Sequence, residues 1–129
     1  MSANNRALRQ RLAGASEINL SVIGRKSGRT ITIPIWFVFD RDTLYLLPVQ
    51  GSDTQWYKNV LNNPTMRIKA RGAEAQFNAV PLTDRSTVES VIEKFRAKYG
   101  AGDVKKYYSK FDVAVIAEPR GARCSFFLN

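Results

Sequence analysis

The sequence contains no histidine and a single cysteine, Cys124, among its 129 residues. Histidine is the usual general base at neutral pH and a common zinc ligand, so its absence excludes Ser-His-Asp and Cys-His nucleophile systems. One cysteine cannot form an internal disulfide, and no apolar run is long enough for a signal peptide or a membrane span. We therefore expect a cytoplasmic protein without a metal site, in which a bound organic cofactor supplies any difficult chemistry.

Acidic residues are also scarce, with 11 Asp and Glu against 20 Lys and Arg and a net charge of +9. So basic a domain favours an anionic partner: a phosphorylated or polycarboxylate small molecule, nucleic acid or an anionic membrane surface. A base-stacking surface would need aromatic side chains interleaved with basic ones. The aromatic residues Trp36, Trp56 and Tyr57 lie apart from the basic residues of the expected strand at 65–71, which are Arg67, Lys69 and Arg71. We therefore expect that the protein binds no nucleic acid, whereas peripheral contact with a membrane remains open.

The alternation of apolar and polar residues predicts one domain over residues 1–129, built mainly from strands, with a helical lead-in at 1–16. Strands are expected at 17–23, 29–40, 43–49, 65–71, 74–82 and 111–119, with a last candidate at 122–129, and helices at 4–13, 54–63, 84–99 and 103–110. This pattern is typical of a small, closed or nearly closed antiparallel barrel of six to seven strands with covering helices, a mainly β α+β fold. Its own side chains fill so small a barrel, so we expect any ligand on the outer wall or at a subunit interface.

The segment 29–40 predicts one long strand whose two faces differ. Ile31, Ile33, Ile35, Phe37 and Phe39 share the face expected to point into the core. Pro34 lacks an N–H group, which predicts an edge strand or a bulge at that point. Trp36 shares Pro34's face and has two readings of about equal weight: a wall for a flat ligand ring, or a corner residue buried beneath a covering helix. Outward apolar residues would allow two copies to pair, so we leave both monomer and homodimer open; they are Val38, Phe126, Phe127 and Leu128.

The turn at residues 24–29, GRKSGR, places three cations around a serine and two glycines. Glycine allows close backbone approach, and the N–H groups of a tight turn form a concave site for anions, so Arg25, Lys26, Ser27 and Arg29 suit a phosphate. The alternative reading is a basic hairpin turn that points into water. In the helix at 54–63, Asn59 is informative because an amide in a short helix gains little unless it bonds something.

The string VIGRKSGRTITIPIWFVFD, followed by Gln50-Gly51 and QWYKNVLNNP, resembles the deazaflavin-dependent nitroreductase family over about residues 17–119. Members of that family are split-β-barrel oxidoreductases of the FMN-binding type, and they often use coenzyme F420. The resemblance implies hydride delivery from the reduced deazaflavin to an electron-poor small molecule, such as a quinone, a nitroaromatic or an enone. It also implies a cofactor along the outer barrel wall, and a tyrosine from the C-terminal helical segment, here Tyr99, that faces the substrate.

The same resemblance assigns the cofactor contacts. The anionic tail of the cofactor would lie by Arg25, Lys26 and Ser27. The ring would meet two backbone segments, formed by Thr32, Ile33, Pro34, Ile35 and Trp36 and by Leu47, Pro48, Val49 and Gln50. The helix would close the other side with Gln55, Trp56, Tyr57, Lys58 and Asn59.

Two positions depart from the family pattern. Relatives usually carry a basic residue where this chain has Ile31, and often a lysine near Gln50. With fewer cations to hold a tail, two alternatives stay open: an FMN-dependent reductase of the same fold, and a non-catalytic basic module that binds an anionic ligand.

Overall fold

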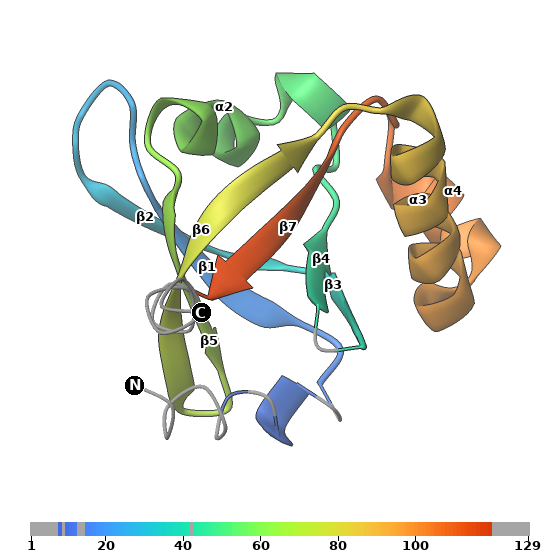
Figure 1. Cartoon of the computed structure of the whole chain (residues 1–129), viewed down its shortest axis with the longest axis horizontal. Coiled ribbons are helices and arrows are strands. Elements are labelled where there is room, and N and C mark those ends of the chain that lie inside the picture. The colour runs from blue at the N-terminus through green and yellow to red at the C-terminus, as the bar shows by residue number, and fades with distance from the viewer. Residues whose placement is uncertain (1–7, 9, 13–14, 42, 120–129) are drawn as a thin grey trace, which may run out of the picture.

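The computed structural model describes residues 8, 10–12, 15–41 and 43–119. In this part of the chain, seven strands form one antiparallel sheet that curls into a half-barrel (Figure 1). The strands are β1 (Ile18–Ile23), β2 (Thr30–Ile35), β3 (Phe37–Asp40), β4 (Thr43–Leu46), β5 (Thr65–Ala70), β6 (Ala73–Leu82) and β7 (Ala114–Pro119). The helices are η1 (Gly51–Asp53), α2 (Gln55–Asn62), α3 (Arg85–Tyr99) and α4 (Ala101–Tyr107). The predicted mainly β barrel is confirmed.

The order of the strands explains how the sheet closes. It runs β2-β1-β5-β6-β7-β4-β3, so β2 and β3 follow each other in the chain yet occupy opposite edges. Only Trp36 separates them, and the single long strand predicted over 29–40 is therefore wrong. The edge position predicted from Pro34 is confirmed, because β2 is hydrogen-bonded only to β1, with Pro34 opposite Asn19. At Trp36 the chain leaves β1 and joins β4, which turns the sheet into a split barrel.

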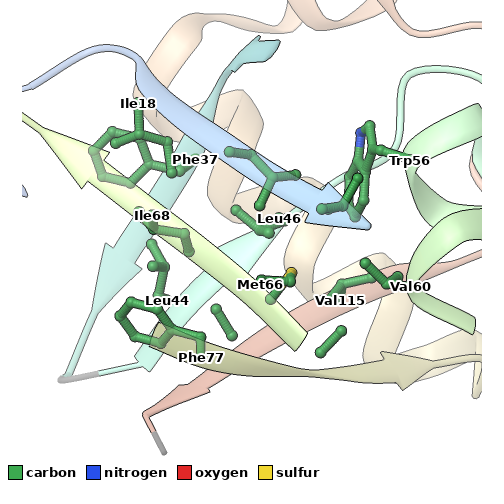
Figure 2. Packing of buried hydrophobic residues seen from close by; sticks show 14 of the residues in the cluster. Ile18, Phe37, Leu44, Leu46, Trp56, Val60, Met66, Ile68, Phe77 and Val115 are labelled. Carbon is green, nitrogen blue, oxygen red and sulfur yellow. The ribbon is translucent and has the colours of Figure 1, made fainter. Parts of the chain in front are cut away.

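The side chains of the barrel fill its interior, as expected for so few strands (Figure 2). Leu20, Phe37, Leu46, Met66 and Ile68 are fully buried there. Each such side chain contributes about 1.5–3 kcal/mol through the apolar surface it removes from water. Trp56 and Val60 attach α2 to the same cluster. The described residues of the predicted lead-in behave likewise, since Leu8 and Leu12 are buried against this core.

A second apolar cluster joins the sheet to α3 and α4, which lie together at the right of Figure 1. Val38 belongs to it and is only 7% exposed, so the prediction of Val38 as an outward, pairing residue is wrong. The reason is that α3 packs on the face of β3 that was expected to be open.

Ile31 is a further correction. It was predicted to lie in the core, but its side chain is 41% exposed, because it lies near the turn end of the edge strand, against Gly24.

The boundaries of the helices follow local signals. Asp84 caps α3 by accepting a hydrogen bond from the Thr87 N–H at 3.1 Å, and Gly100 ends the helix with φ of +97°. The helix α4 covers Ala101–Tyr107 and so begins earlier than the predicted 103–110. The candidate strand at 122–129, together with Cys124, Phe126, Phe127 and Leu128, lies outside the described residues.

Candidate functional site

A cavity of about 350 Å³ opens where β2 passes into β3. Its walls come from this junction, from the segment after β4 and from the first turn of α2, and the end of α4 with Tyr108 and the residue before β1 complete them. Six of the predicted contact residues line it: Pro34, Ile35, Trp36, Leu47, Val49 and Trp56. The structure thus brings together, in one mainly apolar hollow, residues that the resemblance had assigned to a flat ring.

The indole of Trp36 is both a corner residue and a wall of the cavity. Its ring stacks on Tyr99 with centroids 4.2 Å apart and planes 7° apart, which places it against the helical cover. Tyr107 meets it edge-on at 5.6 Å. Offset-stacked and edge-to-face pairs of this kind stabilise by about 0.5–1.5 kcal/mol beyond the area they bury. Trp36 is only partly buried, so it is a corner residue packed against the helical cover, and its role as a wall for a ligand ring stays a prediction.

Tyr99 binds backbone with its hydroxyl group. The oxygen accepts a hydrogen bond from the Phe37 N–H at 3.1 Å and lies within donating distance, 2.8 Å, of the carbonyl oxygens of Phe37 and Ser16. Burial raises the pKa of Tyr99 to about 12. The ring lies behind Trp36, and Tyr99 is not among the residues that line the cavity, whereas Tyr107 is. The substrate-facing role of Tyr99 stays a prediction.

Replacing Tyr99 with phenylalanine should lower the free energy of unfolding by about 1–3 kcal/mol, because the Phe37 N–H loses its Tyr99 acceptor and one backbone carbonyl loses the hydroxyl donor. The folded state keeps the phenolic proton to about pH 12, whereas the ordinary pKa is 10.0. The stability from this shift is therefore complete below pH 10 and is lost as the pH rises through 12. Denaturant unfolding between pH 7 and 12 would show a weaker alkaline loss in Tyr99→Phe.

Tyr107→Phe serves as the matched control for this substitution. Tyr107 is 52% exposed, so its change should move the free energy of unfolding by less than about 0.5 kcal/mol. Equal stabilities of the two variants would contradict the structural role given to the Tyr99 hydroxyl.

The basic turn is attached to α2 through Arg25. Its backbone N–H and its guanidinium both donate to Asn59 Oδ1, at 3.1 and 2.8 Å, and the guanidinium also donates to Gln55 Oε1 at 2.9 Å. Asn59 is only 5% exposed, so its amide is oriented within the structure, as its unusual place in the sequence suggested. Because both side-chain partners are neutral amides, these bonds position the guanidinium without cancelling its charge. The turn is thus bonded to α2, the helix that also carries Trp56 of the cavity wall.

The loop after β4 is fixed by contacts with the segment before β7. The Ser109 N–H donates to the Val49 carbonyl at 2.9 Å, and Gln50 forms a bridge with Lys110. Asp112 accepts from the backbone N–H and the hydroxyl of Ser52, at 2.9 and 2.5 Å. Val49, which lines the cavity, is therefore held in place by contacts just before η1 and within it.

The other predicted contacts lie around the cavity or away from it. Lys26, Ser27 and Thr32 are exposed, and Thr32 pairs with the Ser21 hydroxyl. Gln50 and Gln55 are exposed and Lys58 is half-buried. Tyr57 and Pro48 are buried, and Ile33 packs against the core. Burial, together with the charge of Asp112, raises the pKa of Tyr57, so this phenol stays neutral at physiological pH.

Three residues line the cavity that the motif-based reading did not assign to it: Glu17, Tyr107 and Tyr108. The tyrosine pair at the end of α4 was visible in the sequence as aromatic residues beside a helix. Nothing in the sequence distinguished Glu17 as a site residue, because an acidic residue before a strand is common. Among the described residues, no three metal-ligating side chains gather in one place, and no helix is long and apolar enough to cross a bilayer.

Solved structures share this fold at low sequence identity. The chain is similar to an F420-H2 dependent reductase, FDR-A, with 19% identity over 80% of this chain and 94% of that one, and a TM-score of 0.62. It is similar to HutZ, a heme storage protein from Vibrio cholerae (14% identity, 89% of each chain, TM-score 0.67). It is also similar to the conserved hypothetical protein Rv2991 from Mycobacterium tuberculosis (14% identity, 89% and 79% of the two chains, TM-score 0.68).

These similarities confirm the resemblance to the split-barrel deazaflavin-dependent nitroreductases at the level of the fold. The neighbours bear different functional names, a reductase and a heme storage protein, so the fold alone does not choose between them. No curated protein matches the sequence. A model of the family DUF2255, described as uncharacterized protein conserved in bacteria, matches residues 9–116. The chain therefore belongs to the DUF2255 family and has a split-barrel fold.

Proposed function

We propose that this protein is an F420-dependent oxidoreductase that reduces an electron-poor small molecule. The observation that carries the proposal is that α2 connects the two parts of the site: Trp56 lines the apolar, aromatic cavity, and the neutral amides of Gln55 and Asn59 orient Arg25 of the basic turn. A flat redox ring with an anionic tail needs such a pair of neighbouring environments. The similarity to the fold of an F420-H2 dependent reductase supports the same choice.

The residues present fit such a cofactor. Pro34, Trp36 and Leu47 would contact the ring, whose large apolar faces suit a hollow of about 350 Å³. Arg25 would hold an anionic group of the tail, with Lys26 beside it in the same exposed turn. When bound in its reduced form, the deazaflavin supplies a hydride. The protein then has to bind and orient the cofactor and the acceptor and keep water away from them. None of these tasks needs a histidine.

Within this proposal the two tyrosines have different tasks. Tyr99 positions the site: it stacks on Trp36 and binds the backbone of Phe37, which fixes the corner between β2 and β3. Tyr107 lines the cavity and is half exposed, so we add it to Tyr99 as a tyrosine that would meet the substrate. The single cysteine of the chain favours a cytoplasmic setting, and both monomer and homodimer remain predictions.

The direct test is a titration of the purified protein with F420, followed by deazaflavin fluorescence at low and at physiological salt. We expect saturable binding that weakens as salt rises, because charge on the turn provides much of the attraction to the tail. FMN and hemin, titrated in parallel, should bind more weakly. Unchanged fluorescence over the full F420 range would exclude the proposal. Tighter FMN binding would replace it with a flavin reductase, and tighter hemin binding with a heme-binding role.

A further inference from the structure

The cavity has an acidic end. Of its lining residues, only Glu17 has an acidic side chain, and the others are apolar or aromatic. Glu17 directly precedes β1, and the basic turn directly follows it. The six residues of β1 span roughly 20 Å at about 3.3 Å per residue. The hairpin of β1 and β2 thus carries a carboxylate at the cavity end and three cations at the turn end.

This polarity orients a ligand that carries its negative charge on one side. An anionic tail is attracted toward Arg25 and repelled by Glu17, so the group opposite the tail is directed to the Glu17 end. A second molecule that enters at this end meets a carboxylate in a protein whose net charge is +9. The local charge therefore selects a kind of partner that the net charge alone would not suggest.

The aromatic walls strengthen the same preference. Tyr99 covers one face of the Trp36 indole, and the rings of Tyr107 and Tyr108 also contact it, with centroids 5.6 and 6.0 Å away. Tyr107 stands nearly perpendicular to Trp36, at 78°, and is more than half exposed. Aromatic faces carry negative potential and attract cations by about 0.5–2 kcal/mol, most strongly where water is excluded. Lys106 Nζ already lies 5.3 Å from the centroid of the Tyr107 ring, so a flat cation would bind against the Trp36 indole and the Glu17 carboxylate.

We propose that the Glu17 end of the cavity binds a planar, cationic nitrogen heteroaromatic as the electron acceptor. This step rests on the proposed function. The acceptor gains a hydride, a C–H bond forms on its ring, and the positive charge is lost to give a neutral dihydro ring. The reduced deazaflavin is thereby oxidised by two electrons and releases one proton to water. The acceptor itself needs no proton, which agrees with a cavity that offers no imidazole to donate one.

Three small probes of similar size and different charge test the binding preference without cofactor. They are 1-methylquinolinium, 1-naphthalenemethanol and 1-naphthoate, and their binding is followed by the NMR signals of the two indole N–H groups. We expect 1-methylquinolinium to bind at least five times more tightly than 1-naphthoate, with the neutral probe between them. In Glu17→Gln this ratio should fall to less than about two.

Glu89→Gln is the matched control, because it removes one exposed acid on α3 that does not line the cavity. It should leave the ratio unchanged. Equal or tighter binding of 1-naphthoate to the wild-type protein would overturn the proposal, as would equal effects of the two substitutions. The F420 titration is separate: a cation preference without F420 binding refutes the redox role alone, and F420 binding without a cation preference refutes the acceptor class alone.

Discussion

Replacing Gly51 with alanine is expected to lower the free energy of unfolding by about 2–4 kcal/mol and the melting temperature by roughly 8–15 °C. Gly51 has φ of +55°, a conformation that costs a side chain about 1–2 kcal/mol. A Cβ atom there would also lie 2.1 Å from Asp112 Oδ1, which is far inside contact distance. The carboxylate must then move and give up its bonds to Ser52. Thermal and denaturant unfolding measure the loss.

Substitutions at two other glycines distinguish the backbone strain at Gly51 from the close contact with Asp112. Gly72 has φ of +87° and open space around it, so Gly72→Ala should show the backbone strain alone. Gly102 lies in α4, also in open space, and Gly102→Ala should be neutral or stabilising by up to about 1 kcal/mol. Adding Asp112→Ala to Gly51→Ala should relieve the contact. If Gly51→Ala lowers the free energy of unfolding no more than Gly72→Ala does, the close approach of Asp112 does not contribute to the destabilisation.

The same substitution should also affect ligand binding, because Gly51 anchors the loop that presents Val49 to the cavity. F420 affinity should fall in Gly51→Ala at temperatures where the variant is still folded. Gly72, at the hairpin between β5 and β6, should show no such effect.

The barrel could be predicted from the sequence because its signals are local. Alternation in segments such as 65–71 fixes which side chains are buried, and Asp84 and Gly100 mark the ends of a helix through their own backbone neighbours. The break at Trp36 was missed because alternation continues through it. What interrupts the strand is a change of partner, from β1 to β4, and no local pattern records which strands pair.

The cavity was predicted only in part for a related reason. Residues near the motif, such as Pro34 and Trp36, were assigned to it through the resemblance. Tyr107 and Glu17 come from segments far from each other in the chain, and their meeting depends on how α4 packs against the sheet. Tyr99 is the opposite case. The resemblance placed this tyrosine near the site, but its hydroxyl binds the backbone of Phe37, 62 residues earlier in the chain, and no local sequence pattern predicts such a contact.

The substitution Arg25→Met should weaken F420 binding by about 10- to 100-fold. A hydrogen bond to a charged group contributes about 1.5–3 kcal/mol, and this guanidinium is already oriented by Asn59 and Gln55. The backbone N–H of residue 25 still donates to Asn59 in the variant, so the buried amide keeps a partner and the fold should persist. Arg25→Lys keeps the charge but loses the fork of donors, which predicts an intermediate affinity.

The control for net charge is Arg85→Met, which removes an exposed arginine from the first turn of α3. It should change F420 affinity by less than about twofold, and its unfolding should match that of the wild-type protein. Equal weakening by Arg85→Met and Arg25→Met would mean that the cofactor senses only the total charge. Full affinity in Arg25→Met would mean that Arg25 does not hold the tail.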